Sequence, residues 1–119
     1  MEYEYNSKGD SMIPVCVPFL GKKELEYVMD AVKSNWISSK GKYVELFEKK
    51  FAEYCGCEYG ISTTSGTTAL HLALASIGIK KGDEVIIPTF TMISTAFAVI
   101  YCDAKPVLVD AEPETWNMD

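Results

Sequence analysis

Arginine is absent from this 119-residue sequence: all 11 basic residues are lysine, and 17 acidic residues give a net charge of −6. A negatively charged chain is a poor partner for the phosphate backbone of nucleic acids. Without guanidinium groups, the chain also lacks the forked side chain that clamps diphosphates at two points. The composition therefore argues against a nucleic-acid partner, and any phosphate must be held by other groups.

Metal-binding and membrane-spanning patterns are missing as well. The four cysteines form no CxxC pair, and His71 is the single histidine. This set does not supply a zinc site, so we expect no metal and interpret the cysteines as thiols in a reducing compartment. No segment approaches the roughly 18 consecutive apolar residues of a membrane span, and no apolar signal segment opens the chain. We expect a soluble, cytoplasmic protein with no membrane contact.

Apolar spacing predicts two helices in the first half of the chain. Leu25, Val28, Met29 and Val32 recur at helical intervals and predict a helix from residue 22 with one buried stripe. A second helix is expected across residues 43–54, stopped by Gly56. Residues 1–12 mix charge with small residues and are expected to form a flexible arm, with one domain across residues 13–119.

The second half alternates short apolar runs with helical segments. Strands are expected at residues 59–62, 85–87 and 107–109, with helices through residues 70–77 and 92–101 between them. This order is the repeated βαβ unit of a parallel sheet, so the fold class is α/β. Three strands leave unpaired sheet edges and uncovered faces, which indicates part of a larger fold.

The most informative segment joins the first expected strand to the next helix. It runs through Ser65, Gly66, Thr67 and Thr68, small hydroxyl residues around a glycine. The first helical turn has unpaired N–H groups and the positive end of the helix dipole, so a phosphate binds there readily. Ordinary helix capping is the alternative, since Ser and Thr favour helix starts in general. Neither GxxxxGK[ST] nor GxGxxG is present, so the common nucleotide loops are not indicated.

The order of several further motifs resembles the DegT/StrS-type sugar-nucleotide aminotransferases, which are fold-type I pyridoxal-phosphate enzymes. The matching pieces are PFLG (18–21), NWISSKG (35–41), FEKKFA (47–52), TSGTTALHLAL (64–74), GDEVI (82–86), PTFT (88–91) and KPVLVD (105–110). The resemblance runs from about residue 13 to 119. It implies the N-terminal part of a fold-type I large domain, an αβα sandwich with a mostly parallel sheet, here incomplete.

By this resemblance the cofactor is pyridoxal 5′-phosphate, with Gly66 and Thr67 binding its phosphate and Ser65 and Thr68 supporting them. The residue after PTFT covers the cofactor ring; it is usually aromatic in the family and is Met92 here. Met92 can cover a ring through its sulfur or can be an ordinary core residue.

The resemblance also places Trp36 and Ser38 at the border of the sugar-nucleotide site. Packing of Trp36 between helices is the alternative. His71 lies beside an apolar stripe and is interpreted as structural.

The resemblance implies transfer of an amino group, from glutamate, to a nucleotide-linked keto-deoxysugar, as in perosamine-type synthases, by a homodimer. The lysine that binds the cofactor covalently and the acid beside the pyridine nitrogen lie downstream in similar enzymes. The lysines of this sequence fall in polar positions and do not replace the lysine that binds the cofactor covalently. No catalytic residue is therefore assigned, and the chain alone is expected to be inactive. Three alternatives stay open: a dehydratase of the same family with histidine in place of that lysine, a non-catalytic module that pairs with full-length subunits, and an unrelated phosphate binder.

Overall fold

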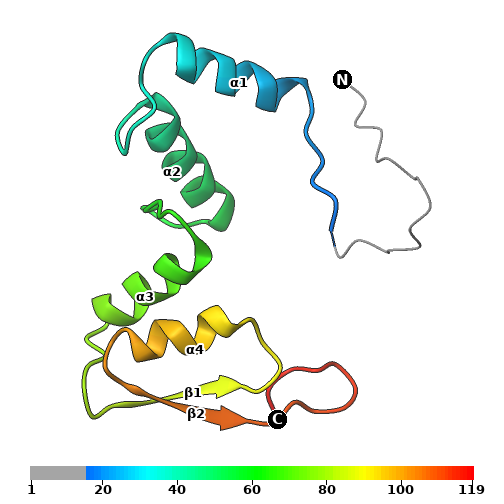
Figure 1. Cartoon of the computed structure of the whole chain (residues 1–119), viewed down its shortest axis with the longest axis vertical. Helices are drawn as coiled ribbons and strands as arrows, with labels where there is room; N and C mark the ends of the chain where they lie inside the picture. The colour runs from blue at the N-terminus through cyan, green and yellow to red at the C-terminus, as the bar shows by residue number, and fades with distance from the viewer. Residues whose placement is uncertain (1–15) are drawn as a thin grey trace, which may run out of the picture. The chain divides into compact units, whose positions relative to one another are not determined.

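The structure is a computed structural model that describes residues 16–119 (Figure 1). The arm expected at residues 1–12 lies outside the described residues. Six elements follow in the order α1 (Lys22–Lys33), α2 (Lys42–Cys55), α3 (Gly66–Ser76), β1 (Glu84–Pro88), α4 (Ile93–Ile100) and β2 (Lys105–Val109). The chain divides into two compact units between Tyr43 and Val44, and each is described by itself. The single domain expected across residues 13–119 stays a prediction.

A parallel βαβ unit organises the second half of the chain. Strands β1 and β2 pair in parallel with Ile86 opposite Val107, and α4 forms the connection between them (Figure 1). The α/β class with a parallel sheet is therefore confirmed. Both strands and the helix between them fall within about two residues of their expected positions, and α3 begins at Gly66, where the sequence predicted the helix to start.

A small core lies between the strands and α4. Ile87, Val99 and Ala104 are buried together, and Leu74 of α3 packs against them. The opposite face of β1 stays open at Ile86, which is 61% exposed. His71 of α3 contacts Tyr101 with ring centroids 5.6 Å apart. This aromatic contact is consistent with the structural role expected for the histidine.

The strand predicted at residues 59–62 is wrong, because the structure leaves this segment outside any sheet. Its backbone lies against α2 instead: the N–H of Ser62 donates to the carboxylate of Glu48 over 2.8 Å. A strand exists only where a neighbour completes its hydrogen-bond ladder, and no neighbour pairs with this segment among residues 16–119. The described sheet accordingly has two strands and one crossover, not three strands and two crossovers.

In the first unit, helix α1 forms where it was predicted, but the predicted burial of its apolar stripe is wrong. Leu25, Val28 and Val32 are 54%, 61% and 59% exposed. Helical spacing gathers apolar side chains on one face, but burial also requires a second surface to cover that face. No other helix or strand lies within the described part of the first unit to cover this face. None of the helices within residues 16–119 is both long and apolar enough to cross a bilayer.

Candidate functional site

Helix α3 begins with a reciprocal cap made by Ser65 and Thr68. Ser65 has extended backbone angles (φ −163°, ψ 165°), and its Oγ accepts a hydrogen bond from the N–H of Thr68 over 3.3 Å. In return, the N–H of Ser65 donates to Oγ1 of Thr68 over 3.1 Å. Oγ1 of Thr68 also donates to the carbonyl of Ser65 over 2.8 Å. Both hydroxyl side chains are thus engaged in holding the turn.

The two residues between these caps keep their donors available. Among the described residues, neither the N–H of Gly66, nor that of Thr67, nor the Thr67 hydroxyl has a hydrogen-bond partner. Gly66 is exposed, and a Cβ built on it would meet no atom within 4 Å. Unpaired amides at the positive end of a helix are the groups that bind phosphate in many proteins. The residues present therefore fit a phosphate monoester.

The segment leading into this turn is fixed against α2. The carboxylate of Glu48 accepts two hydrogen bonds from Ser62, one from its N–H and one from its Oγ, each over 2.8 Å. The backbone and side-chain hydrogen bonds from Ser62 lower the pKa of Glu48 below its ordinary value. A Cβ at Gly60 would lie 2.5 Å from the carbonyl oxygen of Glu48, so only glycine permits this close approach. Sequence spacing alone does not reveal this anchor.

Met92 lies on a separate loop, between β1 and α4. It is the N-cap residue of α4, with extended backbone angles, and its side chain is 75% exposed. The structure therefore does not place Met92 in the core. Thr89, three residues earlier, donates its N–H to the carbonyl of Val109 over 2.8 Å and its Oγ1 to Asp110 Oδ1 over 3.3 Å. Met92 thus follows the carboxyl end of a parallel strand, the edge where open α/β sheets bind ligands.

In the first unit, Trp36 and Ser38 lie on the loop between α1 and α2. Trp36 is 58% exposed, which is more than a tryptophan buried in a helix joint would be. Oγ of Ser38 lies 3.4 Å from the carbonyl of Lys40, a long hydrogen bond within the same loop. Asn35 takes a left-handed conformation (φ 60°) where α1 ends, and Gly41 precedes the first residue of α2.

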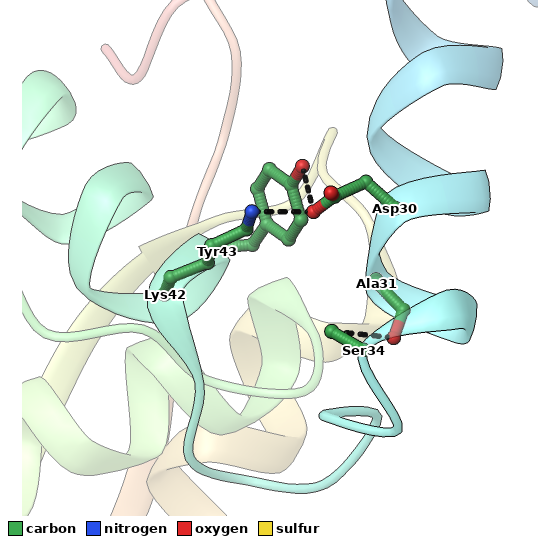
Figure 2. Close-up of polar contacts among 5 residues, drawn as sticks. All are labelled: Asp30, Ala31, Ser34, Lys42 and Tyr43. Carbon is green, nitrogen blue, oxygen red and sulfur yellow. Dashed lines mark hydrogen bonds and ion pairs between the residues drawn. The ribbon is translucent and has the colours of Figure 1, made fainter.

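A polar cluster closes the base of this loop (Figure 2). Oδ2 of Asp30, near the end of α1, lies 2.5 Å from Nζ of Lys42 and accepts a hydrogen bond from Oη of Tyr43 over 2.8 Å (Figure 2). The hydrogen bond from Lys42 is the main reason that the pKa of Asp30 is lowered, and Tyr43 adds to the effect. The same contacts raise the pKa values of Lys42 and Tyr43. We name Asp30, Lys42 and Tyr43 the loop clasp.

The site residues predicted from the sequence fall into three groups. Ser65, Gly66, Thr67 and Thr68 meet in one helical turn, Met92 stands on another loop of the same unit, and Trp36 and Ser38 belong to the first unit. Sequence reasoning missed Glu48 and Asp30, whose side chains contact residues far apart from them in the chain. No signal in the apolar pattern marks them.

No other feature of the described residues is a better candidate for a phosphate or cofactor site than the start of α3. A hollow of about 390 Å³ lies beside α2, but Glu45, Glu48 and Glu53 in its lining disfavour an anion. No group of three metal-ligating side chains occurs within residues 16–119. Every lysine in that range is exposed, and the two whose pKa is shifted, Lys42 and Lys105, have it raised. None of these is the desolvated amine that covalent cofactor binding requires.

Comparisons with known proteins agree with the family that the sequence motifs indicated. The model of the DegT/DnrJ/EryC1/StrS aminotransferase family matches residues 18–119. The chain is 50% identical over 107 residues to the GDP-perosamine synthase of Caulobacter vibrioides, covering 90% of this chain and 29% of that protein. It therefore spans less than a third of the length of this relative.

Solved structures of sugar-modifying PLP enzymes are also similar to this chain. The candidate sugar aminotransferase Spr1654 of Streptococcus pneumoniae, in its PLP form, superposes with a TM-score of 0.82 at 31% identity, over 90% of this chain and 27% of that one. A GDP-4-keto-6-deoxymannose-3-dehydratase with a trapped PLP-glutamate geminal diamine has a TM-score of 0.80 at 27% identity, over 89% of this chain and 29% of that one.

Proposed function

Because the chain belongs to the DegT/DnrJ/EryC1/StrS aminotransferase family, we propose that it is the phosphate-binding part of an enzyme that transfers an amino group to a nucleotide-linked keto-deoxysugar. The observation that carries this proposal is the start of α3, where the amides of Gly66 and Thr67 have no acceptor among the described residues. The likeness to GDP-perosamine synthases supports a GDP-linked sugar as the substrate.

The cofactor in this proposal is pyridoxal 5′-phosphate, whose ring supplies an electron sink for carbanion chemistry when it is bound. Gly66 and Thr67 hold its phosphate through their N–H groups and the Thr67 hydroxyl. Ser65 and Thr68 keep the turn in shape through their mutual hydrogen bonds. Met92 covers one face of the ring with its exposed, polarizable side chain.

The remaining parts of the proposal concern substrate and assembly. Trp36 and Ser38, on the loop closed by the loop clasp, border the sugar-nucleotide site. Glutamate is the amino donor, which the trapped PLP-glutamate adduct of the related dehydratase supports. The complete enzyme is a cytoplasmic homodimer. Residues 1–119 alone do not turn over, because no described lysine is buried.

A dehydratase of the same family is the second candidate. Its support is the TM-score of 0.80 to GDP-4-keto-6-deoxymannose-3-dehydratase, which is nearly equal to that for the sugar aminotransferase. Both activities use the same phosphate site, so residues 16–119 do not separate them. The discriminating observation is the residue at the downstream cofactor position, lysine for the aminotransferase and histidine for the dehydratase.

The proposal is tested by titrating the chain with pyridoxamine 5′-phosphate, which does not react with surface lysines. Thr67→Val keeps the shape of the side chain but removes the unpaired hydroxyl. A hydrogen bond to a charged group contributes about 1.5–3 kcal/mol, so we expect Thr67→Val to weaken binding about 10-fold or more without lowering stability.

Thr68→Val is the matched control, because the hydroxyl of Thr68 belongs to the cap. Loss of a cap costs about 1 kcal/mol, so this variant lowers the free energy of unfolding. If the wild-type chain binds neither pyridoxamine 5′-phosphate nor inorganic phosphate, or if Thr67→Val binds as tightly as wild type, the proposal is wrong.

A further inference from the structure

The loop that follows β2 is an ordered turn built around Glu112. The carboxylate of Glu112 accepts hydrogen bonds from the N–H groups of Glu114 (2.8 Å) and Thr115 (2.6 Å) and from the Thr115 hydroxyl. The N–H of Trp116 donates to the carbonyl of Glu112 over 3.2 Å. A bridge between Ala111 and Met118 closes the turn. This loop is therefore rigidly shaped by its own hydrogen bonds.

Trp116, at the tip of this turn, has two unusual properties. Its backbone is left-handed (φ 62°), a conformation that bulky residues rarely adopt. Its ring is 60% exposed, yet it contacts the ring of Phe90, with centroids 5.2 Å apart and planes tilted by 55°. The turn around Glu112 thus holds a large aromatic side chain against the loop that follows the other strand.

Three separate contacts join these two loops at the carboxyl ends of β1 and β2. The first two run from Thr89, to the carbonyl of Val109 and to the carboxylate of Asp110, and the third is the Phe90–Trp116 pair. Figure 1 shows the loop after β2, in red, beside the ends of both strands. Residues 89 and 90 lie directly before Thr91 and Met92, so these contacts fix the start of the segment that carries Met92.

Resting on the function proposed above, we propose that Trp116 is a positioning residue for the cofactor ring. It acts through Phe90, which it holds in place, and thereby sets the position of Met92 over the ring. It does not act on the phosphate, which is held by the first turn of α3. The role of Trp116 therefore predicts a loss of affinity for the ring-bearing ligand alone.

The experiment compares the affinities of the full 119-residue chain for pyridoxamine 5′-phosphate and for inorganic phosphate, by calorimetric titration. We expect Trp116→Leu to weaken binding of pyridoxamine 5′-phosphate about 2- to 10-fold, the range typical of an aromatic pair, and to leave phosphate affinity unchanged. Trp116→Phe restores most of the loss because it keeps an aromatic ring. Tyr54→Leu, which removes an 89% exposed aromatic ring from α2, changes neither affinity.

A second variant guards against simple misfolding. Phe90→Leu removes the other ring of the pair and produces the same selective loss, and the double variant with Trp116→Leu loses no more than either single variant. Equal weakening of both ligands, or no change in either, overturns the positioning role. Absence of binding of both ligands to the wild-type chain instead overturns the proposed function, and this inference falls with it.

Discussion

Replacing Gly60 by alanine is expected to destabilise the chain through a clash that side-chain motion does not relieve. The new Cβ would lie 2.5 Å from the carbonyl oxygen of Glu48, 3.2 Å from its carbonyl carbon and 3.4 Å from its Cα. All three are backbone atoms of α2, so the helix and the segment before α3 must move apart by roughly 1 Å to restore ordinary contact.

The magnitude follows from what overpacking costs in other proteins. Forcing an extra methyl group into a closely packed contact costs about 1–3 kcal/mol. Separation of the two backbones also stretches the hydrogen bonds from Ser62 to the Glu48 carboxylate, which adds to the loss. For a small domain, a change of this size is a substantial part of the total free energy of unfolding.

Urea denaturation followed by circular dichroism measures this effect, and Gly66→Ala is the matched control. A Cβ at Gly66 meets no atom within 4 Å, and alanine favours helix over glycine. We expect Gly66→Ala to leave the free energy of unfolding unchanged or to raise it by up to about 1 kcal/mol. An unfolding midpoint for Gly60→Ala equal to that of wild type, or to that of Gly66→Ala, would refute the close packing described for this segment.

Two other predictions concern the first unit and the cysteines. Asp30→Asn removes the negative charge and the titration of the group to which Lys42 and Tyr43 donate. Because those hydrogen bonds lower the folded pKa of Asp30, the stabilising effect of its carboxylate is present above the ordinary value of 3.8 and is lost as the pH falls through the folded value. Urea midpoints should therefore differ between wild type and variant at pH 7 and converge below pH 3.8, and a pH-independent difference would contradict this. The thiol of Cys102 is half-buried, whereas those of the other three cysteines are exposed. Cys102 should therefore react with the thiol reagent DTNB more slowly than the other three. Equal reaction rates for all four thiols would contradict this prediction.

Local sequence patterns predicted the second half of the fold well and the first half in part. Strands β1 and β2 and the helix between them were readable because their apolar residues contact each other within one βαβ unit. The segment at residues 59–62 has a strand-like composition, but a strand also needs a pairing partner, which composition does not report. The apolar stripe of α1 likewise predicted a helix correctly but said nothing about what covers it.

The capped turn at the start of α3 was readable from the sequence because its residues are contiguous in the chain, from Ser65 to Thr68, and its binding of a phosphate stays a prediction. The contacts that fix its surroundings were not readable. The Glu48–Ser62 hydrogen bonds join residues 14 apart, and the Thr89–Asp110 hydrogen bond joins residues 21 apart. Side-chain pairs at such separations depend on how the elements pack, which periodicity in a single sequence does not contain.

The self-contained cap at the start of α3 has a consequence for how a ligand would associate. Since Ser65 and Thr68 satisfy each other before anything binds, the turn requires no induced fit, and little conformational entropy is spent on ordering it. Association with a phosphate at Gly66 would then proceed as a single fast step, at a rate set by diffusion and by the net negative charge of the chain.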